Sequence, residues 1–107
     1  MTNEDSTERC AEIFKAMGDR TRLSILRSLF SGEQCVTDLA RSLEMDAPRV
    51  SFHLTRLKYA GLVIDERRGQ RVLYSLNPSV CRTDTKGETH IDLGDCTVRF
   101  GSDDSVR

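Results

Sequence analysis

The sequence contains no long apolar run, and this absence excludes a membrane-spanning helix, which needs about 20 consecutive apolar residues. The segment 1–8 is polar and acidic, unlike a secretory signal peptide, which has a basic start and an apolar centre. We therefore expect a cytoplasmic protein that has no membrane partner and keeps its thiols reduced. With 107 residues, of which 37% are hydrophobic and 31% charged, the chain has room for one domain.

Catalytic and metal-binding motifs are also missing. The four cysteines lie far apart in the sequence, at Cys10, Cys35, Cys81 and Cys96. Without a Cys-x-x-Cys pair, the sequence indicates neither a structural zinc site nor a thioredoxin-type motif. There is no glycine-rich phosphate loop, and the two histidines stand far apart, without a Ser-His-Asp or Cys-His order. We therefore expect no enzymatic activity.

An overall positive charge is lacking too, but the charges are unevenly distributed. The formal net charge is −1. Residues 49–71 carry six bases and two acids, a net charge of +4. Residues 1–48 carry six bases and nine acids, and residues 84–107 carry three bases and six acids, so each of these segments is at −3. This polarity is typical of a protein that meets nucleic-acid phosphates with one face.

The first two predicted helices are delimited by capping residues and glycines. Residues 5–8 supply capping side chains for the first helix, and Gly18 is expected to end it in the left-handed conformation. Asp19 is the expected N-cap of the second helix, which stops at Gly32. Between these residues, apolar side chains recur at the spacing of an amphipathic helix.

Two further helices are predicted to form a helix-turn-helix. A short helix begins near Thr37, and a fourth follows Asp46, with Pro48 in its first turn, where the missing N–H costs nothing. The fourth helix is basic and ends at Gly61. Its expected buried stripe consists of Val50, Leu54 and Leu57. A short helix, a tight connection and a basic helix in this order are typical of a helix-turn-helix.

The hydrophobic period changes from 3.6 to 2 after the fourth helix. Residues 63–67 and 71–76 are strand-like, and the loop 68–70, which contains a glycine, joins them into a predicted β-hairpin. A basic hairpin at this place is typical of the wing that accompanies a helix-turn-helix. The polar residues 81–88 are expected to form a loop.

A second hairpin is predicted over residues 90–100. A two-residue turn at 94–95 would place all the apolar residues on one face. The expected cross-strand pairs are Leu93 with Cys96, Ile91 with Val98, and Thr89 with Phe100. We therefore expect Cys96 to be a small buried hydrophobe, and the residues after Gly101 to be disordered.

Several runs along the chain are typical of one known family. They are residues 14–23 (FKAMGDRTRL), 35–40 (CVTDLA), 50–54 (VSFHL), 60–63 (AGLV) and 67–76 (RRGQRVLYSL). Together they resemble the ArsR/SmtB family of metalloregulators, over about residues 9–78. The resemblance implies a dimeric winged-helix repressor that leaves its operator when an inducer binds, classically a metal or metalloid ion.

The chain departs from the family pattern at its sensing positions. The family's cysteine-type sensors carry Cys-Val-Cys-Asp in the third helix, and Thr37 here replaces the second cysteine, which leaves Cys35. The usual C-terminal helix with carboxylate and histidine zinc ligands has no counterpart, and the predicted hairpin, with His90, stands in its place. No cofactor is required for DNA binding, and a metal or metalloid ion is left open as the inducer.

We therefore predict a mainly α protein with a small β part, of the α+β class. Residues 1–80 would form a winged helix-turn-helix of four helices and a hairpin wing. Residues 81–107 would form a C-terminal extension with a second hairpin in place of the usual last helix.

The predicted DNA contacts lie on the fourth helix and the wing. Arg49, Ser51 and Phe52 lie off the buried stripe, where they can reach base edges in the major groove. Phosphate contacts are expected from Lys58, Arg67, Arg68 and Arg71. The alternative is a solvated helix face with charges that serve solubility. Arg20, Arg22 and Arg27 are assigned either to phosphate contacts or to salt bridges. We expect His53 to be half buried and hydrogen-bonded for packing.

The leading hypothesis is a sequence-specific DNA-binding transcriptional regulator, a homodimeric repressor of double-stranded operator DNA. One alternative is a thiol-based metal, metalloid or redox sensor acting through Cys35, with a further sulfur from Cys10, Cys81 or Cys96. A further alternative is a redox switch that pairs Cys81 with Cys96, and Cys10 is expected to be simply buried. The other alternative is a winged-helix protein-interaction module, which the basic wing disfavours.

Overall fold

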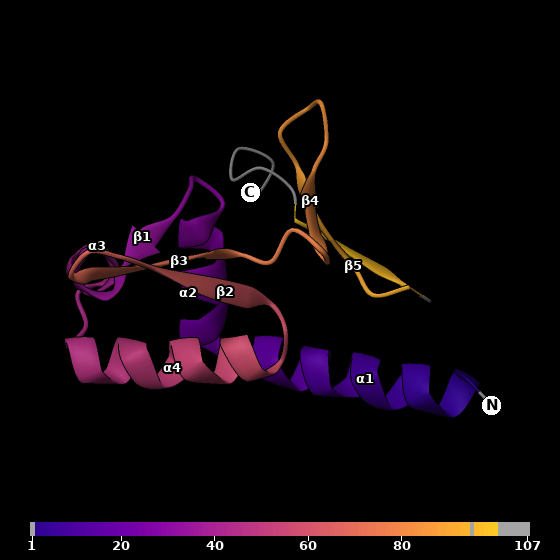
Figure 1. Cartoon of the computed structure of the whole chain (residues 1–107). Helices are drawn as coiled ribbons and strands as arrows, with labels where there is room; N and C mark the ends of the chain where they lie inside the picture. The colour runs from indigo at the N-terminus through magenta and orange to yellow at the C-terminus, as the bar shows by residue number, and fades with distance from the viewer. Residues whose placement is uncertain (1, 95, 101–107) are drawn as a thin grey trace.

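The computed structural model describes residues 2–94 and 96–100, with side chains from residue 7 onwards. Its helices are α1 (Thr2–Met17), α2 (Arg20–Leu29), α3 (Val36–Leu43) and α4 (Ala47–Tyr59). In Figure 1, α4 and α1 lie along the lower edge, with the wing above α4 and a second sheet above α1. The predicted α+β class, with four helices, a wing and a C-terminal hairpin, is confirmed. No described helix is both long and apolar enough to cross a membrane.

Capping signals set the boundaries of α2 and α4. The Oδ2 of Asp19 accepts a hydrogen bond from the backbone N–H of Arg22 at 3.0 Å, which caps α2 as predicted. α4 begins after Asp46, although this side chain makes no capping hydrogen bond. Gly61 follows α4 with a positive φ of 86°, a conformation that favours glycine.

α1 differs from the prediction at both ends. It begins at Thr2, so the capping residues at 5–8 lie inside the helix. Acidic residues suit the positive N-terminal end of a helix, which favours this earlier start. Gly18 does not adopt the predicted left-handed conformation. A Cβ at this position would lie 3.2 Å from the carbonyl oxygen of Phe14, so the glycine permits a close backbone approach instead.

The first sheet contains the wing. β2 (Val63–Arg68) and β3 (Arg71–Leu76) pair antiparallel, so that the connecting turn is one residue shorter than the predicted loop. The short strand β1 (Gln34–Cys35) pairs with the other edge of β3, which gives the order β1-β3-β2. The wing is therefore hydrogen-bonded to the segment that directly precedes α3.

The second sheet confirms the predicted hairpin and its register. It consists of β4 (Cys81–Thr83), β5 (Thr89–Asp92) and β6 (Thr97–Phe100), in the order β4-β5-β6. Ile91 pairs with Val98, and the N–H of Leu93 donates to the carbonyl of Cys96 at 2.9 Å. Asp95 and the C-terminal segment for which disorder is predicted lie outside the described residues.

Two expectations about the C-terminal extension are wrong. The sequence predicts a loop over 81–88, but residues 81–83 form an edge strand paired with β5, with Cys81 buried and the next two residues exposed. A strand of this length is too short to show an alternating pattern. Cys96 is predicted to be buried but is exposed, because it lies at the hairpin tip, away from the core.

The core includes residues from all four helices and from both sheets. Its fully buried apolar side chains are Ile13, Ile25, Leu26, Leu39, Val50, Leu54, Leu57, Leu62, Val63 and Ile91. The second sheet is attached through Phe100, whose ring meets that of Phe30 edge-on with centroids 5.2 Å apart. The N–H of Asp92 also donates to the carbonyl of Val80 at 2.7 Å. The extension therefore packs against the helical domain.

Candidate nucleic-acid interface

A tight turn positions α4 against α3. α3 ends at Glu44, which is the only non-glycine residue with a positive φ, 57°, in the described part of the chain. The N–H of Met45 then donates to the carbonyl of Ala40 at 2.9 Å, which closes the turn. α4 starts at Ala47, only a few residues later. This geometry is that of a helix-turn-helix, in which the second helix is the one that enters the major groove.

The outward face of α4 is set by its buried stripe, which is confirmed. No surface remains exposed on Val50, Leu54 and Leu57. The predicted base-contacting residues lie near the N-terminal end of the same helix, and all three are exposed: Arg49, Ser51 and Phe52. A phenylalanine that is 56% exposed leaves much of its apolar surface in water, where it can contact a partner.

Arg56 belongs to this face but was missed in the sequence analysis. Its guanidinium carbon lies 5.4 Å from the centroid of the Phe52 ring, within the range of a cation–π contact. The two residues are four positions apart on a helix, so the spacing alone was an available signal. Arg56 therefore adds a positive charge to the exposed face of α4 and orients the Phe52 ring.

A half-buried polar cluster fixes α4 to the junction of α1 and α2. Arg22 donates from Nε to the carbonyl oxygen of Ala16 at 2.6 Å, and its Nη1 lies 3.2 Å from Nδ1 of His53. His53 is only 9% exposed, and Asp19 Oδ2 lies 4.0 Å from its Nδ1. His53 is thus more buried than the half burial predicted, whereas its hydrogen-bonded packing role is confirmed, and Arg22 has a structural partner rather than a free guanidinium.

The environment of His53 lowers the pKa of its imidazole. Burial is the main cause, because it disfavours the charged form, and the nearby cations Arg22, Arg49 and Arg56 act in the same direction. Asp19 opposes the shift but does not outweigh it. The shift favours the neutral imidazole, whose Nδ1 can accept a hydrogen bond from Arg22.

Three of the four predicted phosphate-contacting bases form exposed ion pairs. The three bases are Lys58, Arg68 and Arg71, and the pair of Arg71 is with Asp38. Lys58 Nζ lies 3.0 Å from Asp65 Oδ2. The two terminal nitrogens of Arg68 donate to the carboxylate of Glu33 at 2.8 and 2.9 Å, and one of them also donates to Glu66 at 3.1 Å. These exposed pairs are weak and can be exchanged for contacts with phosphate.

Arg67 differs from its neighbours at the wing tip. It is exposed, and no described residue forms an ion pair or hydrogen bond with its side chain. Its guanidinium is therefore available to an anion without the loss of an internal contact. The partner of Arg68 at Glu33 was not predictable from sequence, because 35 positions separate the two residues.

Arg71, the fourth base, connects the wing to the start of α3. Its Nη2 donates to Cys35 Sγ at 3.3 Å and to Asp38 Oδ2 at 3.4 Å. These residues line a hollow of about 390 Å³ between the wing and α3. The structure thus joins two sequence predictions that were separate, a phosphate contact at Arg71 and a sensing thiol at Cys35.

The remaining cysteines do not form a sulfur cluster with Cys35. Cys10 Sγ lies 4.0 Å from the carbonyl of Leu93, and Cys81 Sγ lies 3.8 Å from that of Leu62. Burial raises the pKa of the Cys81 thiol to about 11, which disfavours its thiolate. Within the described residues, no group of three potential metal ligands contains a cysteine. A three-sulfur site is therefore not preformed.

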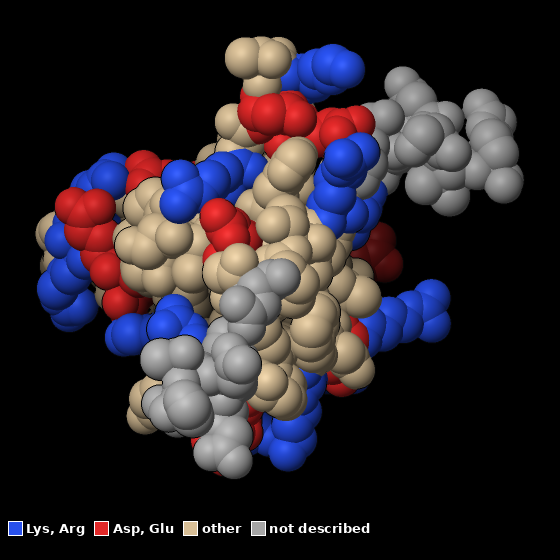
Figure 2. All heavy atoms as spheres, turned by 90° about the vertical axis from the view of Figure 1, so that its right-hand side faces the viewer, with Lys and Arg blue, Asp and Glu red and all other residues tan. Residues whose placement is uncertain are grey.

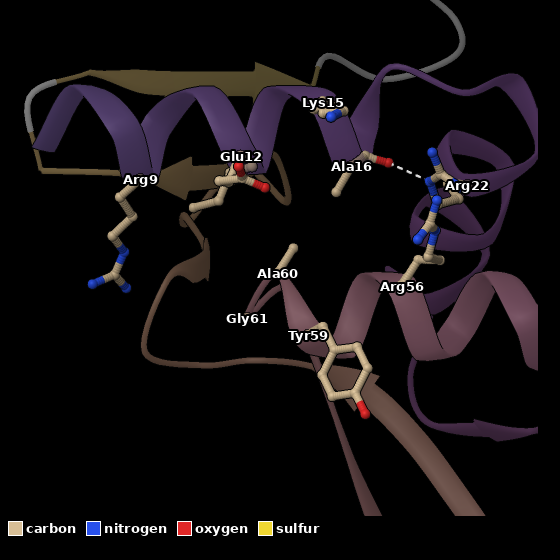
Figure 3. Close-up of a pocket in the computed structure, with 10 residues that line it drawn as sticks. Arg9, Glu12, Lys15, Ala16, Arg22, Arg56, Tyr59, Ala60 and Gly61 are labelled. Carbon is tan, nitrogen blue, oxygen red and sulfur yellow. Dashed lines mark hydrogen bonds between the residues drawn. The ribbon is translucent and has the colours of Figure 1, made fainter. Parts of the chain in front are cut away.

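A cavity of about 530 Å³ lies between the C-terminal end of α4 and α1. Figure 3 shows Arg9 and Glu12 extending from α1 towards this space, with Ala60 facing it from the other side. The dashed line marks the contact between Arg22 and Ala16 that closes one end. Small residues at positions 60 and 61 leave the space open, and the charged residues that line it are basic apart from Glu12.

Charges are distributed differently at the end of the molecule that carries α1 and the second sheet. Figure 2 shows basic and acidic side chains interspersed there around uncharged residues. Phe14 of α1 is 44% exposed, although it is large and apolar. This end of the molecule therefore carries charges of both signs, and α1 offers an apolar side chain to a partner.

Comparisons with known proteins agree with this geometry. The family model "Bacterial regulatory protein, arsR family" matches residues 19–65, which span α2 to β2. The arsenic resistance transcriptional regulator ArsR1 of Pseudomonas putida is 42% identical over 69 residues, covering 64% of this chain and 54% of the relative. The transcriptional repressor SdpR of Bacillus subtilis is 41% identical over 68 residues, covering 64% of this chain and 76% of the relative.

A solved structure shows the same architecture. The solution structure of the homodimeric winged helix-turn-helix DNA-binding domain of Mb0332 from Mycobacterium bovis, a possible ArsR-family regulator, superposes with a TM-score of 0.68. The two are 32% identical, and the match covers 71% of this chain and 70% of that chain. The protein is a winged helix-turn-helix of the kind found in transcriptional regulators. It belongs to the arsR family of bacterial regulatory proteins. The chain spans only about half the length of some relatives, such as ArsR1.

Proposed function

We propose that the protein is a sequence-specific DNA-binding transcriptional regulator that acts as a homodimeric repressor and leaves its operator when an inducer binds. The main supporting observation is the exposed N-terminal end of α4, with Arg49, Ser51 and Phe52, next to a basic wing. In this proposal Arg49 hydrogen-bonds guanine, Ser51 bonds a base or phosphate, and Phe52 contacts a thymine methyl group. We place the protein in the cytoplasm, as a regulator rather than an enzyme.

The wing would position the protein on the duplex. Lys58, Arg67, Arg68 and Arg71 would contact phosphates, which carry no sequence information themselves but fix the register of the recognition helix. We assign this role to residues 1–80 as the DNA-binding unit, with residues 81–107 as an extension packed on it. The relatives named as repressors, and the homodimeric Mb0332 domain, support the assignment.

The dimer would be built partly from α1. The exposed ring of Phe14 is available for a seam, and two winged helices related by a two-fold axis would read a pseudo-palindrome. Each copy of α4 would then bind one half-site.

The test compares the affinity of an Arg49→Ala variant for a specific operator with its affinity for random DNA. Operators are first selected from random DNA, and affinities are then measured by fluorescence anisotropy at fixed salt. We expect a loss of about 1–3 kcal/mol on the selected site and a relaxed base preference, with a much smaller loss on random DNA. Exposed Glu12→Gln on α1 serves as a control that should leave the ratio unchanged. Equal losses of affinity for both DNAs would indicate that Arg49 contacts a phosphate and not a base.

A second candidate function is thiol-based gating through Cys35. The observation in its favour is the hydrogen bond from Arg71 to Cys35 Sγ, because a ligand that binds the sulfur must change the contacts of a wing arginine. Zinc, cadmium and arsenite are titrated into reduced protein on operator DNA, and the titration is repeated with Cys35→Ser. Release that disappears in the variant supports gating, and DNA binding that no ion changes assigns Cys35 a structural role.

A further inference from the structure

The β4–β5 connection brings together three side chains with metal-ligating atoms. Asp84 and Glu88 flank the turn, and His90 lies on β5. One ligand atom from each residue lies within 4.8 Å of the other two. This is the only such group of three within the described residues, and none of its members is a cysteine or a residue to which we assign a DNA contact.

The imidazole of His90 carries the clearest sign of a missing partner. Its Nε2 is buried, yet it has no hydrogen-bond partner, although 28% of the whole side chain is exposed. Asp84 Oδ2 lies 3.3 Å from this nitrogen, but the contact lacks the alignment of a hydrogen bond. A buried polar atom without a partner is uncommon in a folded protein, and an ion bound beside it would supply the partner.

The carboxylate of Asp84 is held in place by the turn itself. Its Oδ1 accepts hydrogen bonds from the backbone N–H groups of Lys86 and Glu88, both at 2.9 Å, which leaves Oδ2 directed towards His90. The site thus contains an oriented carboxylate oxygen that lies 3.3 Å from a buried imidazole nitrogen.

We propose that Asp84, Glu88 and His90 form a binding site for a first-row divalent cation of the Zn²⁺ type. One imidazole and two carboxylates are a donor set that zinc accepts, and ligand atoms at about 2.0–2.1 Å from a tetrahedral ion lie roughly 3.3 Å apart. The Asp84–His90 spacing already has this value. Glu88 has a carboxylate oxygen within 4.8 Å of both other ligand atoms and would complete the set, with water in the remaining position.

Arg99 is the nearby group that acts against the site. Its Nε lies 3.9 Å from Glu88 Oε1, at the edge of an ion pair, and the Glu88 side chain is 31% exposed. A contact of this length is weak and leaves the second carboxylate oxygen of Glu88 available. The cation would tie the turn after β4 to β5, on the side of the second sheet away from its apolar face.

The test is metal binding to the full chain, measured without DNA, so that it is independent of the proposed repressor function. Cys10→Ser, Cys35→Ser and Cys96→Ser are introduced to remove the accessible thiols, and Cys81 is left in place because it is buried. Zn²⁺ binding is measured by calorimetry, and Co²⁺ is used for its visible and near-ultraviolet absorption. We expect one ion per chain and no thiolate-to-cobalt charge-transfer band.

Three variants distinguish this site from adventitious binding. His90→Gln removes the nitrogen ligand, and Asp84→Asn removes the ionised oxygen while keeping an acceptor for the turn. Each should weaken binding by at least about tenfold, the low end of what even outer-shell changes cost. Asp92→Asn is the matched control on the same strand and should bind as the parent does. Absence of binding in the parent, or unchanged affinity in His90→Gln, would overturn the proposal.

Discussion

The ion pairs of the wing make a quantitative prediction about salt dependence. Arg67 has no partner among the described residues, whereas Arg68 is paired with Glu33 and Glu66. Arg67→Ala removes one phosphate contact per protomer and nothing else. Each contact contributes about 0.9 to the slope of log Kd against log salt, so a dimer should lose about 1.8. Between 50 and 200 mM salt, the variant's affinity should therefore change roughly tenfold less than that of the parent.

Arg68→Ala should weaken DNA binding more than Arg67→Ala, because it also leaves two carboxylates facing the phosphates. The assay is fluorescence anisotropy with one operator at several salt concentrations. The matched control is Arg68→Ala combined with Glu33→Gln and Glu66→Gln, which removes the excess negative charge. This combination should return the affinity to near that of Arg67→Ala. Equal affinities for Arg67→Ala and Arg68→Ala, or an unchanged slope in either, would refute the wing assignment.

Three further predictions concern stability and assembly. Because the pKa of His53 is lowered in the folded protein, the unfolded chain binds the proton first as the pH falls below about 6.5. The free energy of unfolding should therefore decrease as the pH falls through this range, and chemical denaturation should no longer detect this decrease in His53→Gln. Leu54→Ala should cost about 2–5 kcal/mol in the same measurement, since Leu54 is fully buried, and a smaller loss would indicate that the site collapses. Phe14→Glu should shift sedimentation from dimer to monomer, and an unaffected dimer would place the seam elsewhere.

The helix-turn-helix and both hairpins could be predicted from the sequence because local signals agreed there. In α4, the stripe of Val50, Leu54 and Leu57 allows only one face to be buried. In the second hairpin, a shift of one residue would move Ile91 and Val98 to the solvent side, so the register was strongly specified. Such patterns depend on residues close in sequence, so these elements could be predicted from the sequence alone.

Features that depend on distant residues or on very short elements could not be predicted. The contact between Arg68 and Glu33 and that between Arg71 and Cys35 exist only because β1 joins the wing sheet, and a two-residue strand has no pattern of its own. Asp84 meets His90 because the three-residue strand β4 pairs with β5, and a strand of this length likewise shows no pattern in the sequence. The acidic turn was read as an ordinary loop, because the strand that precedes it was not recognised.

Mutations at the contact between Arg71 and Cys35 test whether thiol sensing and DNA binding are connected. Arg71 cannot hold Cys35 and Asp38 and also direct the same nitrogen at a phosphate. Cys35→Ala removes one of these acceptors, so it should release Arg71 towards DNA and strengthen operator binding. The gain should vanish in an Arg71→Ala background, which makes the two changes non-additive by at least about twofold in Kd. Additive effects would mean that the sulfur and the wing act independently, and that gating through Cys35 needs another route.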